Sequence, residues 1–197
     1  MQSQIFNLIV TGYGGQGILT LADLISKAAL KQGYKVKESE LHGLAQRGGS
    51  LDCHIRFTKD KDIYSSIVTR ANADLIISLE ATEALRACYW ANPDTVILTN
   101  SKIFRSSLSM EKILKEIKKF TKNIYVIDAD KIVEKETRSN LSVNIFMLGY
   151  ALRKRVLLLD KENIWKAIEE KINKNFIEEN KKIFEKALGL LTERRQL

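Results

Sequence analysis

Gly-Tyr-Gly-Gly-Gln-Gly, residues 12–17, follows a short apolar run at residues 5–10 and opens a stretch with helical periodicity. The run reads Ile-Phe-Asn-Leu-Ile-Val, which is typical of a buried parallel strand. The spacing Gly12-x-Gly14-x-x-Gly17 is that of a dinucleotide-binding turn. Backbone N–H groups at the start of such a helix favour an anionic or electron-rich group. Three interpretations stay open: a tight turn for packing, a NAD or FAD site, or a ligand site shared with a partner protein.

A second glycine-rich segment lies further along the chain and matches no part of a nucleotide-binding motif. It reads His-Gly-Leu-Ala-Gln-Arg-Gly-Gly-Ser at residues 42–50. Arg47 carries a planar guanidinium suited to phosphate or carboxylate, although a surface salt bridge is the plainer interpretation. His42, taken alone, is more often a satisfied, partly buried imidazole. Both glycine segments stand beside a predicted strand end, so we expect them to form one composite site.

The rest of the chain alternates predicted strands and helices. Strands are expected at residues 34–39, 51–57, 73–79, 95–99 and 123–128, and helices at 16–30, 81–91, 110–120 and from 141 onward. The strand at 51–57 leaves no room for a helix after the strand at 34–39, so this unit departs from a plain βαβ repeat. The pattern predicts α/β architecture: a single domain over residues 1–197, with an open, mostly parallel Rossmann-like sheet, helices on both faces and a helical C-terminal section.

Composition places the chain among ordinary soluble globular proteins, with 45% hydrophobic and 28% charged residues. No apolar run approaches the roughly 20 residues needed to cross a bilayer. The first predicted strand begins at Ile5 without a basic region or cleavage site before it. We therefore expect a cytoplasmic protein with no membrane partner.

The cysteine count excludes several kinds of metal site. Cys53 and Cys88 are the only cysteines, and His42 and His54 are the only histidines. A [4Fe-4S] cluster held by four cysteines cannot be built from this chain, and a Cys/His zinc site is not expected. Both cysteines are better interpreted as small buried hydrophobic residues.

The net charge of +8 is unevenly distributed along the chain. Basic and acidic side chains balance over residues 1–100, so the whole excess lies in residues 101–197. A basic surface of this kind could attract nucleic acid or an acidic protein. No nucleic-acid motif or interleaved aromatic residues accompany it, so a solvated lysine-rich helix face is the better interpretation and no nucleic-acid partner is expected.

The two glycine segments together resemble a known family, the gamma-type domain of 2-oxoacid:ferredoxin oxidoreductases. The form His-Gly-x-Ala-Gln-Arg-Gly-Gly-Ser is most similar to the small (beta) subunit of indolepyruvate ferredoxin oxidoreductase. Further resemblance lies in Asp52-x-His54-Ile55-Arg56, Asp74-Leu75-Ile76 before Glu80, Asn144-x-x-Met147-Leu148-Gly149, Glu178-Glu179-Asn180 and Phe184. The likeness thus extends over nearly the whole chain.

The resemblance implies a subunit that is inactive alone. The family's reaction converts a 2-oxoacid, CoA and oxidised ferredoxin into acyl-CoA, CO2 and reduced ferredoxin. Thiamine diphosphate and [4Fe-4S] clusters are expected on a larger catalytic subunit, and this chain would complete its active-site or CoA pocket. No catalytic residue and no metal ligand is implied here. Candidate cofactor-contacting residues are Gly12, Gly14, Gly15, Gln16, Gly17, His42, Gln46, Arg47, Gly48, Gly49 and Ser50.

Two other classes of function stay open at this point. A stand-alone NAD(P)- or flavin-dependent oxidoreductase would use the glycine turn with Glu38 as a ribose partner. A basic, non-catalytic binding module would use the lysine-rich second half of the chain. In isolation the chain could also self-associate as a homodimer through the surface meant for its partner.

Overall fold

The computed structural model describes residues 5–42, 48–104, 106–137 and 142–189. Its strands are β1 (Phe6–Tyr13), β2 (Lys35–His42), β3 (Ser50–Thr58), β4 (Leu75–Ser78), β5 (Val96–Asn100) and β6 (Ile124–Ile127). Its helices are α1 (Ile18–Lys31), α2 (Ala81–Ala87), α3 (Met110–Ile117), α4 (Ala129–Thr137), α5 (Val143–Arg153), α6 (Lys161–Lys171) and α7 (Ile177–Gly189), with 3-10 turns η1 (Cys88–Trp90) and η2 (Lys174–Phe176). No helix within these ranges has both the length and the apolar character to span a membrane.

The described strands form one six-stranded sheet in the order β2-β3-β1-β4-β5-β6. β1, β4, β5 and β6 pair in parallel, whereas β3 is antiparallel to both β1 and β2. The antiparallel pairing follows from the short connection between β2 and β3, because a parallel neighbour needs a longer crossover segment. The predicted open, mostly parallel α/β sheet is confirmed.

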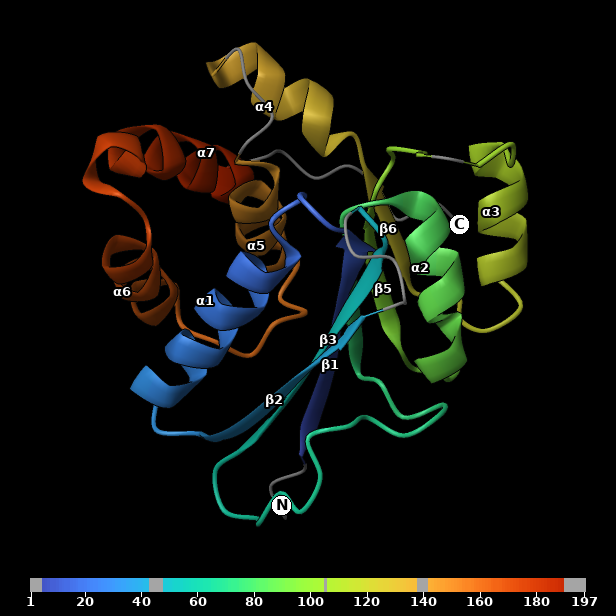
Figure 1. The fold of residues 1–197 in the computed structure, drawn as a ribbon, viewed down its shortest axis with the longest axis horizontal. Helices are drawn as coiled ribbons and strands as arrows, with labels where there is room; N and C mark the ends of the chain where they lie inside the picture. The colour runs from blue at the N-terminus through green and yellow to red at the C-terminus, as the bar shows by residue number, and fades with distance from the viewer. Residues whose placement is uncertain (1–4, 43–47, 105, 138–141, 190–197) are drawn as a thin grey trace.

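Helices cover both faces of this sheet (Figure 1). α1, α5, α6 and α7 lie on one side, and α2 and α3 lie on the other. β1 shows why both sides are apolar. Leu8 and Val10 pack into the core beneath α1, and Ile9 between them packs into the core beneath α2.

The C-terminal section is helical, as predicted, but it does not form a separate unit. α5 packs against α1 and α7, and α6 packs against α1. Gly149 makes the α5–α7 contact possible, because a Cβ there would lie 2.9 Å from Ala187 Cβ and 3.0 Å from Phe184 O. The start of α5 and the α6–α7 connection lie beside the glycine turn, at the carboxyl end of β1.

Several details differ from the sequence expectations. α4 was not predicted, because only Ala129 and Val133 of its nine residues are buried and the apolar pattern is weak. The helix predicted at 81–91 ends at Ala87 and continues as the 3-10 turn η1. β2 runs three residues further than expected, to His42.

Candidate functional site

A cavity of about 570 Å³ opens at the carboxyl end of the parallel strands, which is the usual ligand position in open α/β sheets. Its walls come from the glycine turn, the segments after β4, β5 and β6, and the start of α5 with the α6–α7 connection. The lining residues from the first part of the chain are Tyr13, Gly14, Gly15, Gln16, Gly17, Thr20, Leu79, Lys102, Phe104 and Asp130. Those from the second part are Ser142, Val143, Asn144, Ile145, Lys171, Ile172, Asn173, Phe176, Glu179 and Asn180.

The glycine turn needs glycine for two different reasons. Gly15 and Gly17 have φ angles of +94° and +81°, a backbone region that other residues rarely adopt. Gly12 has an ordinary φ, but a Cβ there would lie 2.6 Å from both Gln16 Oε1 and Ile18 Cδ1. A Cβ on Gly15 would have no atom within 4 Å beyond its chain neighbours, so the turn is open on its cavity side.

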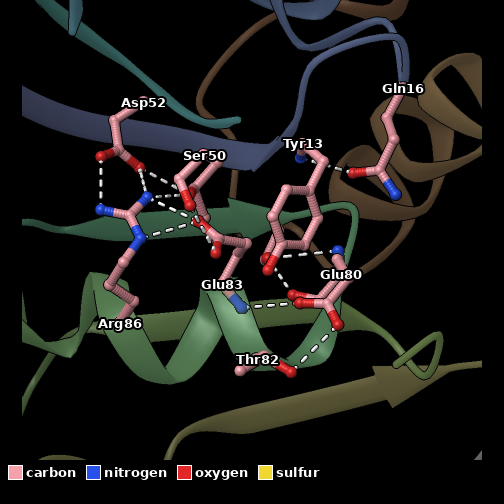
Figure 2. A network of polar contacts seen from close by, with 10 residues as sticks. Tyr13, Gln16, Ser50, Asp52, Glu80, Thr82, Glu83 and Arg86 are labelled. Atoms are coloured by element: carbon pink, nitrogen blue, oxygen red, sulfur yellow. Dashed lines mark hydrogen bonds and ion pairs between the residues drawn. The ribbon is translucent and has the colours of Figure 1, made fainter. Parts of the chain in front are cut away.

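Gln16 stabilises the turn itself. Its Oε1 accepts a hydrogen bond from the Tyr13 N–H at 2.8 Å (Figure 2). The side-chain carbonyl therefore makes a bond within the turn, and the amide NH2 group is a donor at the cavity that Gln16 lines.

The structure brings parts of the two glycine segments together. Gly14 N donates to Gly49 O at 3.0 Å, and a Cβ on Gly14 would lie 3.3 Å from Gly48 N. Of the candidates chosen from sequence, four line the cavity: Gly14, Gly15, Gln16 and Gly17. Gly12, His42, Gly48, Gly49 and Ser50 lie outside its lining, and Gln46 and Arg47 fall outside the described residues.

Two lysines at the cavity were missed by the sequence reasoning. Lys102 follows β5, and its Nζ lies 2.7 Å from Asp130 Oδ1. Lys171 ends α6, and its Nζ lies 2.9 Å from Asp23 Oδ2. Burial acts to raise the pKa of Asp23, but hydrogen bonds from Lys171 and Lys27 outweigh it and hold that pKa below its ordinary value. Both ammonium groups are thus held in place by carboxylates beside the cavity.

A sequence signal existed for one of these lysines. Lys102 comes two residues after β5, and Asp130 comes shortly after β6. Because the carboxyl ends of parallel strands meet at one edge, polar residues in those positions are candidates for a site. Lys171 comes from a helix distant in sequence, and no local pattern marks it.

Aromatic rings stand on two sides of the cavity. The Tyr13 and Phe104 rings meet edge to face, with centroids 5.4 Å apart. Phe176, in η2, also lines the cavity and is 51% exposed. Exposed rings beside the cavity provide surface on which a planar ligand group can pack.

His54 and His42 have different environments. His54 is fully buried in β3, its Nδ1 accepts from the Val68 N–H at 3.0 Å, and its ring packs edge-on against Trp90. Burial lowers the pKa of His54, although nearby Asp52 acts in the opposite direction. His54 is therefore a neutral core residue, whereas His42 is exposed at the end of β2 with Nε2 3.7 Å from Glu40 Oε2.

Neither cysteine has the character of a ligand or nucleophile. Cys53 and Cys88 are buried free thiols, and burial raises the pKa of each to about 12. Within the described ranges, no group of three or more His, Cys, Asp or Glu side chains is arranged to hold a metal ion.

The sheet order argues against a dinucleotide site of the usual kind. In such a site the strand carrying the ribose-binding acid lies next to the strand that leads into the glycine turn. Here β3 lies between β1 and β2, so Glu38 in β2 is two strands away from the turn. Glu38 also accepts a hydrogen bond from the Ser26 hydroxyl of α1, and burial raises its pKa.

Structural comparisons agree with this fold. A pyruvate oxidoreductase subunit PORC from Thermotoga maritima superposes with a TM-score of 0.72 at 23% identity, over 94% of this chain and 96% of that one. A 2-oxoglutarate:ferredoxin oxidoreductase from Magnetococcus marinus, solved with 2-oxoglutarate, coenzyme A and succinyl-CoA bound, gives a TM-score of 0.77 at 18% identity. That match covers 98% of this chain and 32% of the longer chain.

Sequence comparisons identify the family. The family model described as pyruvate ferredoxin/flavodoxin oxidoreductase matches residues 7–190. The chain is 32% identical over 185 residues to the indolepyruvate oxidoreductase subunit IorB of Archaeoglobus fulgidus, which covers 89% of this chain and 90% of that protein. This chain therefore belongs to the pyruvate ferredoxin/flavodoxin oxidoreductase family, among its gamma-type domains.

Proposed function

We propose that the chain is the small subunit of an indolepyruvate-type 2-oxoacid:ferredoxin oxidoreductase and acts only in complex with a larger catalytic subunit. The reaction is oxidative decarboxylation of an arylpyruvate, with CoA and oxidised ferredoxin giving acyl-CoA, CO2 and reduced ferredoxin. The 32% identity to the Archaeoglobus subunit over most of both chains supports this assignment. The whole of residues 1–197 is proposed as one gamma-type domain, and a cytoplasmic location agrees with two free thiols.

The cofactors of this reaction belong, in the proposal, to the larger subunit. Thiamine diphosphate supplies the electron-sink chemistry for decarboxylation, and [4Fe-4S] clusters accept the electrons. The residues of this chain do not fit a [4Fe-4S] cluster, which takes four thiolates, because its two cysteines are buried in β3 and η1. The contribution of this subunit is therefore to bind and orient a ligand at the subunit junction.

The cavity beside the glycine turn is the observation that carries this role. CoA has a nucleotide end with anionic phosphates and a planar base. The start of α1 offers backbone N–H groups with no acidic side chain in its first turn, which favours phosphate. The ammonium groups of Lys102 and Lys171, each held by a carboxylate, offer N–H donors for a phosphate at the same cavity. We therefore assign the cavity to the anionic nucleotide end of CoA.

Arg47 keeps its proposed role toward an anionic group on CoA, substrate or cofactor, although it lies outside the described residues. An Arg47→Ala variant is expected to lower turnover of the reconstituted complex and to leave assembly intact. Unchanged kinetics for both CoA and the 2-oxoacid would contradict this role.

A Lys102→Met variant tests the cavity assignment directly. In the complex with the large subunit, the KM for CoA should rise about tenfold, because a charge-assisted contact to phosphate is lost. The KM for the 2-oxoacid should stay within twofold of the parent value. Lys112→Met, on the exposed face of α3, is the matched control and should change neither constant. An unchanged KM for CoA in Lys102→Met would contradict the assignment.

A further inference from the structure

A cluster of three buried carboxylates and one exposed arginine lies beside the second glycine segment and outside the cavity lining. It consists of three carboxylates and one guanidinium: Asp52 from β3, and Glu80, Glu83 and Arg86 from α2 and its N-cap (Figure 2). The three acidic residues are 5%, 0% and 3% exposed, respectively. Such a cluster with excess negative charge costs desolvation free energy, so its hydrogen bonds must be well placed to keep it folded.

Arg86 links the sheet to α2. Its two terminal nitrogens bind both oxygens of Asp52, at 2.7 and 2.5 Å, and its Nε donates to Glu83 Oε2 at 2.7 Å. Thr11 Oγ1, in β1, donates to Asp52 Oδ1 at 2.6 Å. Burial acts to lower the pKa of Arg86, but its hydrogen bonds to Asp52 and Glu83 raise it above the ordinary value. The guanidinium thus stays charged and fixed in orientation.

Glu83 connects Arg86 to the second glycine segment through a hydrogen bond from Ser50. Its Oε1 accepts a hydrogen bond from Ser50 Oγ at 2.9 Å. Ser50 directly follows Gly49, whose carbonyl oxygen accepts from the Gly14 N–H at 3.0 Å. Gly14 is part of the cavity wall. A continuous series of contacts therefore runs from Arg86 through Glu83 and Ser50 to the cavity.

Glu80 contacts a second segment that lines the cavity, the one containing Phe104. Its carboxylate accepts from the Phe104 N–H at 2.6 Å and caps α2 by accepting from the Glu83 N–H at 2.7 Å. The Phe104 ring in turn meets Tyr13 of the first glycine turn. The first turn of α2 is therefore in contact with both the Phe104 segment and the Ser50 segment.

We propose that Glu83 is a positioning residue, which holds the Gly48–Ser50 segment against Gly14 and thereby fixes the cavity wall on that side. Ser50, chosen from sequence as a cofactor contact, serves in this view as the link, because its hydroxyl is directed to Glu83. The consequence for CoA affinity rests on the proposed function of the cavity. The positioning itself does not, because the contacts are internal to the chain.

The test compares two substitutions of the same kind. Glu83→Gln removes a buried carboxylate that pairs with Arg86 at i,i+3 and accepts a hydrogen bond from Ser50. Glu116→Gln removes it from an i,i+3 pair with Lys119 that is exposed on α3. Hydrogen exchange of the Gly14 amide, followed by NMR in the full-length chain, reports how firmly Gly14 is held to Gly49.

Glu83→Gln should speed exchange at Gly14 about tenfold relative to the parent, because the ion pair that orients the side chain toward Arg86 is lost and the hydrogen bond from Ser50 is no longer charge-assisted. Exchange at Ile9, in the middle of β1, should stay unchanged, and Glu116→Gln should change neither amide. If Glu83→Gln fails to fold, Ser50→Ala removes the same link without leaving a charge unpaired. It should speed exchange at Gly14 about threefold.

Kinetics of the reconstituted complex give the second measurement. Glu83→Gln should raise the KM for CoA about fivefold while kcat at saturating CoA stays within twofold, since the wall is displaced and no reacting group is removed. Unchanged exchange at Gly14 in both Glu83→Gln and Ser50→Ala would overturn the positioning role. Faster exchange with an unchanged KM for CoA would support the positioning role and contradict the proposed assignment of the cavity.

Discussion

Two helices begin at the same edge of the sheet, and their N-termini are built in opposite ways. α1 follows β1 and α2 follows β4, and these two strands pair in parallel. α2 is capped by the buried carboxylate of Glu80 and has Glu83 in its first turn. α1 starts at Gly17 in the left-handed conformation, with no side-chain cap and no acidic residue in its first turn.

This difference separates a structural terminus from one suited to a ligand. The start of a helix carries partial positive charge and N–H groups without intrahelical partners. At α2 the protein supplies its own anion, and the carboxylate of Glu80 also reaches Thr82 Oγ1 and Phe104 N. At α1 the protein supplies glycines, a cavity and nearby lysines. An anion from outside the chain is therefore expected at α1 and not at α2.

Removing the internal anion should have the largest effect. Glu80→Ala is expected to lower the free energy of unfolding by about 3 kcal/mol, because the helix cap is lost and buried N–H groups are left without an acceptor. Urea denaturation followed by circular dichroism measures this. Glu80→Gln keeps the shape and one acceptor and should lose less. A loss below that of an exposed cap would show that the α2 terminus is not structural.

The glycines of α1 should differ from one another. A Cβ on Gly17 would lie 2.5 Å from Asn144 Nδ2 at a φ of +81°, so Gly17→Ala should cost about 2 kcal/mol of stability. Gly15 has a similar φ but open space around it, so Gly15→Ala should cost only about 1 kcal/mol. Thermal unfolding of both variants gives the comparison. Equal losses of stability in the two variants would mean that the positive φ alone, and not the contact with Asn144, sets the cost of a side chain at this turn.

Giving α1 an anion of its own should make it resemble α2. Thr20→Glu places a carboxylate in the first turn at the cavity and should stabilise the chain by about 0.5 kcal/mol at low ionic strength. It should also raise the KM for CoA about fivefold in the complex, because the same N–H groups and cavity are then shared with a negative charge. Thr20→Gln, which has the same length without the charge, is the control. An unchanged or lower KM for CoA in Thr20→Glu would contradict an anion site at the start of α1.

Removing the N-cap of an exposed helix should have the smallest effect on stability. α3 is capped by Ser109, whose Oγ accepts from the Lys112 N–H at 3.3 Å on the surface. Ser109→Ala should lower stability by about 0.5 kcal/mol, because water can replace an exposed cap. The exposed Ser107, changed to alanine, should have no measurable effect in the same urea titration. A loss at Ser109 as large as that at Glu80 would remove the distinction between buried and exposed caps.

Local sequence predicted where the strands and helices lie along the chain better than it predicted which strands are neighbours in the sheet. The strand–turn–helix at residues 5–30 was recognisable because its apolar spacing and glycines act over a few residues. α4 was missed because only Ala129 and Val133 anchor it in the core. Four of the five candidates in the first glycine turn line the cavity, whereas Ser50 is directed to Glu83. A residue's type indicates what it can bind, but not which neighbour it meets.

The sequence by itself determined the class of fold, the glycine turn at the start of α1 and the lack of a cysteine set for an iron–sulfur cluster. Only the tertiary structure decided that β3 separates β2 from β1, that Lys102 and Lys171 meet at one cavity, and that α2 supports the second glycine segment. The physical reason is the range of the interactions. Helical periodicity and backbone φ act within a few residues, whereas a site forms from side chains brought together by packing across the whole chain.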